Sequence, residues 1–157
     1  MQKISPCLWF DQQAEQAANF YVSIFKNSRI VEVARFPEGA PRPAGMVMTV
    51  RFILDGQEFL ALNGGPEYTF SPAISLVAYC ETQRELDAMW EKLSAGGVEV
   101  QCGWLQDKFG VSWQIVPMVL PALMSGKDVA ATQRAMAALL QMKKLDIAAL
   151  ERAYKNT

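Results

Sequence analysis

The sequence contains no histidine among its 157 residues, and histidine is both the usual acid–base group near neutral pH and the commonest metal ligand. Its three cysteines, Cys7, Cys80 and Cys102, are too few and too widely spaced for a disulfide framework or a paired-cysteine metal site. We expect buried, reduced thiols. A reactive Cys102 is disfavoured because no histidine is present to generate its thiolate.

An excess of either charge is also absent. Fifteen basic and sixteen acidic residues leave a net charge of -1, so no basic surface is indicated for nucleic acid or an anionic membrane. No apolar run approaches the length of a bilayer span, and residues 1–10 lack a basic-then-apolar leader. We therefore expect a cytoplasmic protein that has neither a nucleic-acid nor a membrane partner.

The first half of the chain predicts one strand, one helix and three further strands. Residues 3–10 form the strand, and the helix follows with Asp11 placed to cap its N-terminus. Strands at 29–36 and 45–54 flank a loop rich in proline and glycine. Asp55-Gly56 then predicts a hairpin into a strand over 57–63, which completes a βαβββ order.

The second half repeats this order with different residues. A strand at 73–80 precedes a helix that opens with a capping box, Thr82 and Glu85. Strands at 98–106 and 111–117 follow. The sequence therefore predicts an α+β fold of two βαβββ modules, residues 1–66 and 72–118, within a domain of residues 1–119.

The two modules can be overlaid on one another. A shift of 69 residues places Pro6 on Ser75 and Asp11 on Cys80. In the last strand of each module, counting from the turn glycine places Leu60 opposite Gln114.

Residues 120–157 lie outside both modules and predict a helical extension. Two helices would begin at caps Asp128 and Asp146. The first carries a broad apolar face, formed by Ala135, Met136, Leu139, Leu140 and Met142. Such a face is usually intramolecular core, but in an extension it could instead form a contact in a homodimer.

Four stretches carry a family resemblance: "LWFDQQAEQAANFYVSIF", "LNGG", "CGWLQDKFGVSWQIVP" and "MKKLDIAALERAY". Together they closely resemble the PhnB-like proteins of the vicinal oxygen chelate (glyoxalase/bleomycin-resistance/dioxygenase) superfamily, and the resemblance runs almost end to end. Many such proteins carry the name 3-demethylubiquinone-9 3-methyltransferase. The resemblance implies paired βαβββ modules with a ligand cavity between them, and commonly a homodimer.

The resemblance also assigns the positions that hold a metal in metal-dependent members of the superfamily. They correspond to Pro6, Leu60, Ser75 and Gln114. Proline and leucine side chains donate no lone pair, and a hydroxyl and a neutral amide bind divalent transition metals poorly. An alignment error of one residue, which would bring in Cys7, Ala61, Ile74 or Ile115, still gives no usable ligand set. We expect no metal and no other cofactor.

Gln114 keeps hydrogen-bonding capacity at one of these positions. Strand alternation places it on the same face as Ser112. Two roles stay open: Gln114 could orient a bound organic molecule, together with Ser75, or it could satisfy backbone groups. Trp104 could line an aromatic pocket, although large rings on strands more often belong to the core.

The first module offers three further candidates. Asn63 ends a strand before Gly64-Gly65 and could contact a ligand or serve the turn. Arg51 could bind an anionic substrate, pair with Glu58 across the hairpin, or lie exposed on the outer face. Most other carboxylates, Asp107 among them, are expected to be solvated.

Two functions remain in view. The first is metal-independent binding of a small, partly apolar molecule whose identity the sequence does not specify. The alternative is an isomerase, lyase or dioxygenase of the same superfamily, for which a buried, cavity-facing Glu58 would be the acid–base candidate. Methyl transfer in a nucleotide-type fold is disfavoured because "DQQAEQ", which follows the first strand, contains no glycine.

Overall fold

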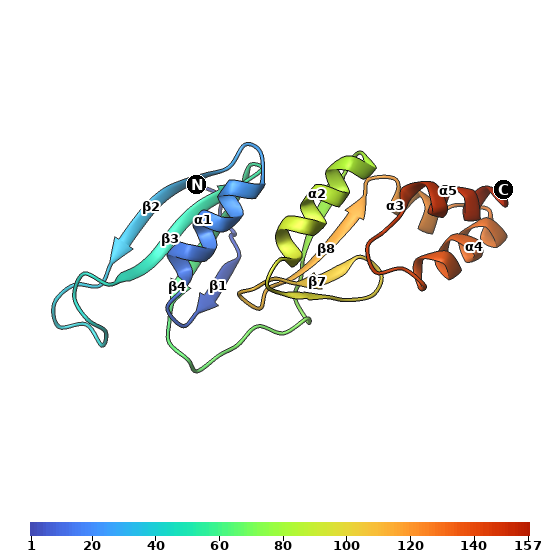
Figure 1. Ribbon diagram of the computed structural model, residues 1–157. Helices are drawn as coiled ribbons and strands as arrows, with labels where there is room; N and C mark the ends of the chain where they lie inside the picture. Colours follow the sequence, from blue (N-terminus) through green and yellow to red (C-terminus); the bar gives the residue numbers. More distant parts are fainter. The chain divides into compact units, whose positions relative to one another are not determined.

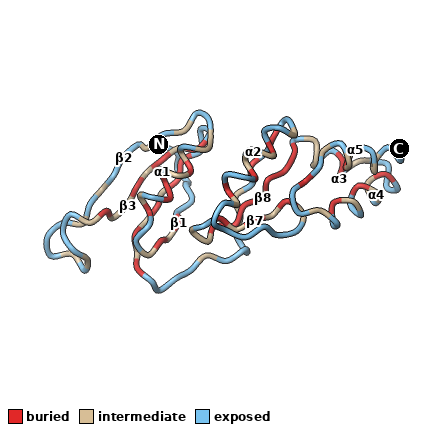
Figure 2. Tube along the Cα trace, in the orientation of Figure 1, coloured by how far each residue is buried: buried red, intermediate tan, exposed pale blue.

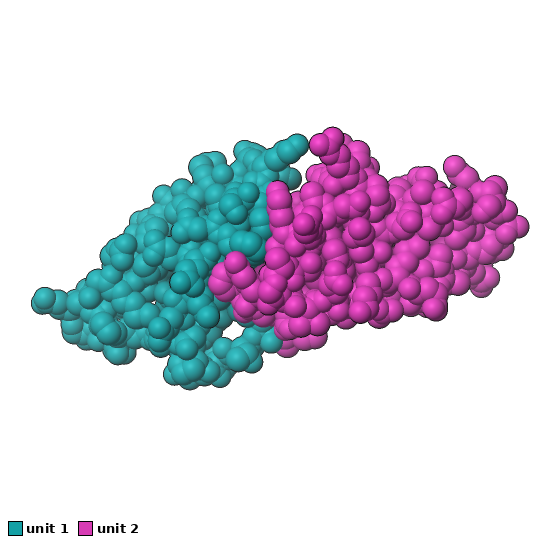
Figure 3. All heavy atoms as spheres, in the orientation of Figure 1, with its two compact units in different colours: residues 1–70 teal, residues 71–157 magenta.

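The computed structural model describes residues 1–157, and its internal contacts divide the chain into two units (Figures 1 and 3). The first unit is Met1–Phe70 and the second is Ser71–Thr157. Each contains one four-stranded sheet, which confirms the predicted α+β class. None of the helices combines the length and the apolar character that crossing a membrane requires.

The first unit has the predicted βαβββ order. Its elements are β1 (Cys7–Phe10), α1 (Ala14–Ile24), β2 (Arg29–Arg35), β3 (Val47–Leu54) and β4 (Gln57–Asn63). The strands lie in the order β1-β4-β3-β2. Strand β1 runs parallel to β4, and the other pairs are antiparallel.

The hairpin between β3 and β4 is confirmed. Leu54 pairs with Gln57 across it. Asp55 and Gly56 have φ values of 44° and 83°, the pair of left-handed conformations that a two-residue turn of this kind requires. Aspartate tolerates this conformation and glycine adopts it freely.

The core of the first unit lies between α1 and one face of the sheet. Tyr21 on α1 and Phe52 on β3 are both fully buried, and their rings lie 6.3 Å apart. Phe52 also stacks on Phe59 of β4 at 5.4 Å. In Figure 2 the buried stretches follow α1 and the strands behind it, whereas β2 is largely exposed. Since α1 is the only helix of this unit, the opposite face of its sheet has no helix of the unit on it.

The second unit repeats the order and adds three helices. Its elements are β5 (Leu76–Cys80), α2 (Gln83–Ser94), β6 (Val98–Glu99), β7 (Trp104–Gln106), β8 (Ser112–Pro117), α3 (Leu120–Met124), α4 (Val129–Leu139) and α5 (Ile147–Lys155). The strands lie in the order β5-β8-β7-β6.

One predicted strand of this unit is wrong. The stretch 98–106 is not continuous, because a turn separates β6 from β7. Cys102 and Gly103 in that turn have φ values of 62° and 82°, which an extended strand cannot contain.

Three of the four predicted helix caps are confirmed, and each is local in sequence. Thr82 Oγ1 accepts a hydrogen bond from the Glu85 amide at 3.1 Å. The side chains of Asp128 and Asp146 likewise accept from amides three residues later, at 3.1 and 3.0 Å. These bonds satisfy amides that otherwise have no partner at a helix start.

The fourth cap, Asp11, was wrongly predicted. Helix α1 begins at Ala14 after Gln13, whose side chain makes no capping bond. The acceptor for the Ala14 amide is instead Asn63 Oδ1, at 2.9 Å, from the end of β4. A distant residue therefore caps this helix.

The extension packs within the second unit. Leu139, Leu145 and Leu150 are buried, so part of the expected apolar face is intramolecular core. Met136 on α4 and Leu140, which directly follows that helix, are 40% and 54% exposed. Helix α3 was not predicted, because its five residues are too few to show a helical period.

Candidate functional site

The helix-free face of the second sheet brings together most of the candidate residues. Gln114 of β8 lies beside Val77 of β5 and Trp104 of β7, and cross-strand neighbours share a face. Ser112 joins the same face two residues before Gln114. Helix α2 packs on the opposite face, with Leu86, Trp90 and Leu93 buried.

Gln114 is the polar centre of this face. Its Nε2 donates a hydrogen bond to Ser75 Oγ at 3.0 Å, so the two candidates are in contact. Both side chains are half-buried. The Gln114 side-chain oxygen, Oε1, accepts no hydrogen bond from its own unit, and it keeps the capacity to accept one from a donor group.

The surroundings of Gln114 are uncharged. The strand residues that share its face are Val77, Tyr79, Val98, Trp104, Gln106, Ser112 and Val116. Val77 and Tyr79 are 42% and 55% exposed and Trp104 is half-buried, whereas Ser112 and Val116 are buried, so the open part of the face lies around Val77, Tyr79 and Trp104. A flat apolar group can stack here while its polar atoms bond to Gln114.

A buried carboxylate, that of Asp107, holds the turn that precedes β8. Asp107 was expected to be solvated but is only 3% exposed. Its Oδ1 accepts from the amides of Phe109 and Val111 at 2.8 and 3.0 Å, and its Oδ2 accepts from Trp113 Nε1 at 2.9 Å. The turn "DKFG" gave a local signal for this role, since aspartate side chains commonly bond to amides two residues on. Asp107 therefore shapes the turn that leads to Gln114.

The first unit gathers a charged group on its helix-free face. Arg51 Nε lies 3.6 Å from Glu58 Oε1, and Arg51 Nη2 lies 3.4 Å from Glu32 Oε2. Glu58 Oε2 also accepts from the Gln2 amide at 3.2 Å. Of the three alternatives for Arg51, the pairing with Glu58 across the hairpin is therefore the one present, and Arg51 faces two carboxylates.

Asn63 lies on the other face of the first sheet and has a structural role. Its side chain is buried, and it accepts from Ala14 and donates to the Val47 carbonyl at 3.0 Å. Both polar ends of the amide are thus engaged between α1, β3 and β4.

The strand register corrects the overlay of the two modules. Cys7 pairs with Leu60 in the first sheet, and Val77 pairs with Gln114 in the second. Leu60 and Gln114 are therefore equivalent, as expected, but the first strands match with a shift of 70 residues rather than 69. By strand alternation Pro6 lies on the helix-facing side of the first sheet. Cys7 therefore takes the place of Pro6, and Val77 that of Ser75, in the set of four equivalent positions.

The corrected set does not fit a divalent metal. Cys7, Leu60, Val77 and Gln114 offer one thiol and one neutral amide, whereas a stable site takes three or four imidazole, thiolate or carboxylate ligands. No three side chains of histidine, cysteine, aspartate or glutamate gather anywhere in residues 1–157. Metal-dependent chemistry has no ligand set at these positions.

Comparison with known proteins gives one matching family model, described as 3-demethylubiquinone-9 3-methyltransferase, over residues 2–116. The match ends before the extension, so the expected resemblance through the tail is not part of it. A search of curated proteins finds no match.

Several solved structures are similar to this chain. A putative 3-demethylubiquinone-9 3-methyltransferase, PhnB protein, from Bacillus cereus has 40% identity and a TM-score of 0.69, covering 74% of this chain and 99% of that one. Protein PA1353 from Pseudomonas aeruginosa has 20% identity and a TM-score of 0.60, covering 74% and 96%. A glyoxalase/bleomycin resistance protein from Albidiferax ferrireducens has 14% identity and a TM-score of 0.46, covering 71% and 95%.

Proposed function

We propose that this chain, which belongs to the PhnB-like family described as 3-demethylubiquinone-9 3-methyltransferase, binds a small uncharged organic molecule without a metal. The ligand would lie on the helix-free face of the sheet formed by β5, β8, β7 and β6. The cytoplasmic location and the cavity between modules stay predictions.

The bond between Gln114 and Ser75 carries this proposal. It presents a fixed amide on a face whose strand residues include no charged side chain. A pocket that combines apolar walls with a few placed polar groups is typical of sites for organic ligands. Because Ser75 holds one amide hydrogen, the carbonyl oxygen and the second hydrogen keep a defined direction for the ligand.

An uncharged ligand is favoured over an ionic one. A carboxylate or phosphate on this face would lose its hydration and gain no cation in return. On the helix-free face of the first sheet, the guanidinium of Arg51 is already flanked by Glu32 and Glu58.

The enzymatic alternative depended on Glu58. Glu58 is buried, but its oxygens are engaged by Arg51 and by the Gln2 amide. A general base must reach a substrate proton, and a carboxylate bound to its own chain in this way is not presented to one. Binding is therefore favoured over catalysis.

The activity in the family's description is not extended to this chain. A nucleotide-type cofactor site uses parallel strands that alternate with helices and a glycine-rich turn at a helix start. Each sheet here has one parallel pair and two antiparallel pairs. The segment between β1 and α1, Asp11–Gln13, contains no glycine.

Matched pairs of aromatic probes test the proposal. Benzamide and benzoate share one ring and differ in charge, as do larger bicyclic amides and their carboxylates. In buffer containing EDTA, we expect the neutral members to shift the NMR signals of the Gln114 side-chain amide and the Trp104 indole, which lies beside it. Followed by the Trp104 indole signal, the Gln114→Ala variant should lose binding about ten-fold or more. Gln141→Ala is the control, since Gln141 is exposed and its side chain has no partner in the same unit.

Two outcomes would overturn the proposal. One is preferential binding of the carboxylates, which would move the ligand site to a cationic surface. The other is equal binding by the Gln114→Ala and Gln141→Ala variants, which would place the probes elsewhere.

A homodimer is proposed as well. Val129 and Met136 on α4, and Leu140 directly after its last residue, are exposed apolar side chains that follow one stripe at spacings of seven and four residues. Light scattering at micromolar concentration should give twice the mass of one chain, 17.5 kDa. A monomeric mass would refute the dimer without affecting the ligand proposal.

A further inference from the structure

We infer that the segment Met142–Ile147 of the C-terminal extension positions Gln114 and Trp104, by holding the turn between β6 and β7. This inference rests on the proposed function for the meaning of that position, but not for its structural content. The segment joins α4 to α5 and lies outside the stretch that the family model matches. We refer to Met142–Ile147 as the strap.

The strap makes two backbone hydrogen bonds to the turn. The amides of Cys102 and Gly103 donate to the carbonyls of Met142 and Lys143 at 2.7 and 2.8 Å. Both donors belong to residues with positive φ, a conformation that is unfavourable for a non-glycine residue such as Cys102. Such a conformation persists where surrounding contacts fix it, and the strap supplies those contacts.

The turn is connected to the proposed ligand face by one hydrogen bond and by the chain itself. The Gly103 carbonyl accepts from the Ile115 amide at 2.8 Å, and Ile115 directly follows Gln114. Trp104 directly follows Gly103 and pairs with Gln114 across the sheet. A displacement of Gly103 therefore moves both side chains that the proposed ligand contacts.

Packing restrains the same point. Leu145 of the strap is fully buried. A methyl group added at Gly103 would lie 3.1 Å from the Leu145 side chain and 3.0 Å from the Ile115 carbonyl oxygen. Leu145 of the strap and the Ile115 carbonyl of β8 thus leave no space for a side chain at Gly103, and this close packing restrains the turn.

Helix α2 fixes the strap in turn. Gln83 Nε2 donates to the Leu145 carbonyl at 3.0 Å, and Gln83 Oε1 accepts from the Ile147 amide at 2.8 Å. Lys144 adds an ion pair with Asp87 at 3.0 Å. Gln83 is therefore a positioning residue, since it acts on Gln114 only through the strap and the turn.

The Gln83→Ala variant tests the inference without any ligand. It removes both side-chain bonds to the strap and leaves the strands unchanged. We expect hydrogen exchange at the Cys102, Gly103 and Ile115 amides to accelerate about ten-fold, because the loss of one or two hydrogen bonds lowers the free energy of local opening by an amount that corresponds to that factor. The signals of the Gln114 side-chain amide and the Trp104 indole should move with them. Lys144→Ala should produce a smaller change at the same groups.

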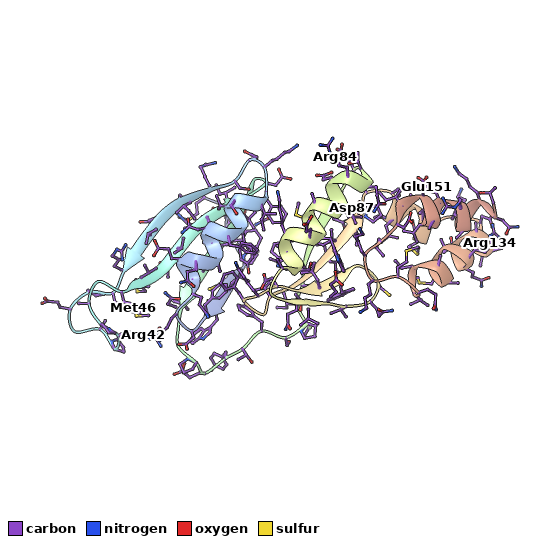
Figure 4. All side chains as sticks on the ribbon, in the orientation of Figure 1. Arg42, Met46, Arg84, Asp87, Arg134 and Glu151 are labelled. Atoms are coloured by element: carbon purple, nitrogen blue, oxygen red, sulfur yellow. The ribbon has the colours of Figure 1, made fainter.

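Arg84→Ala is the matched control. Arg84 neighbours Gln83 on α2, and its exposed side chain projects away from the rest of the unit (Figure 4). It should leave these amides unchanged.

The inference is overturned if Gln83→Ala matches Arg84→Ala at the turn. It is also overturned if exchange accelerates equally at every amide of the second unit, because the strap would then contribute only general stability. The probe experiments on Gln114→Ala are independent of both results, so the ligand proposal and this inference can fail separately.

Discussion

Replacing Asn63 by alanine should destabilise the first unit far more than an ordinary polar substitution. The side chain is 2% exposed and bridges the Ala14 amide and the Val47 carbonyl. Its loss leaves one buried donor and one buried acceptor unpaired, each at about 1–3 kcal/mol. The sum is about 2–6 kcal/mol, a large fraction of the stability of a unit of this size.

The assay is urea unfolding followed by the NMR signals of the first unit, so that the second unit does not mask the transition. Asn19→Ala serves as the control, because Asn19 is exposed on α1 and alanine there favours the helix. Its effect should be a slight gain in stability, below about 0.7 kcal/mol. If Asn63→Ala costs less than about 0.5 kcal/mol, the bridge does not hold α1 to the sheet, and the structural role assigned to Asn63 is refuted.

Two further predictions concern ionisable groups. Burial raises the pKa of the Cys80 thiol to about 11 from an ordinary value of 9.0. Because the folded value is the higher one, the contribution of the thiol to stability is present below pH 9.0 and is lost as the pH rises toward about 11; it amounts to about 3 kcal/mol. The free energies of unfolding of the wild type and of Cys80→Ala should therefore converge as the pH rises through that window. A difference that stays constant with pH would contradict the raised pKa of Cys80. Glu58→Gln should lower stability by about 1–3 kcal/mol, because the partly buried Arg51 then lacks its less exposed partner. The exposed Glu32→Gln control should cost under about 0.5 kcal/mol, and equal losses would refute the distinction.

Local signals in the sequence were sufficient for much of the fold. The caps Thr82, Asp128 and Asp146 were predictable because each side chain bonds to an amide three residues later. The hairpin was predictable because Asp55-Gly56 suits two left-handed residues. The βαβββ order followed from such elements placed in sequence.

The misses arise where distant residues decide the structure. Helix α1 is capped from β4, so no inspection of residues near Asp11 could have found Asn63. Overlaying the modules by pattern gave a register wrong by one residue, and in a strand this exchanges the two faces. Only the pairing of Val77 with Gln114 revealed the correction.

The candidate site was predictable in part. Gln114, Ser112 and Trp104 were named from the stretch "CGWLQDKFGVSWQIVP", and the second sheet brings them together. Ser75 was named from the overlay that proved wrong by one residue, and it nevertheless contacts Gln114. The hydrogen bonds from Cys102 and Gly103 to the strap could not be predicted from the sequence. Backbone groups make them, and every residue type except proline carries both of these groups.

The central claim, that the site works without a metal, is tested most directly by metal analysis of the untagged protein. Thermal-shift titrations with Zn²⁺, Ni²⁺, Mn²⁺ and Fe²⁺ would accompany it, with no affinity tag because tag histidines bind these ions. We predict that no ion co-purifies stoichiometrically and that none raises the melting temperature. Stoichiometric binding of one ion, with stabilisation that grows with its concentration as mass action requires, would contradict the account and favour a metal-dependent enzyme.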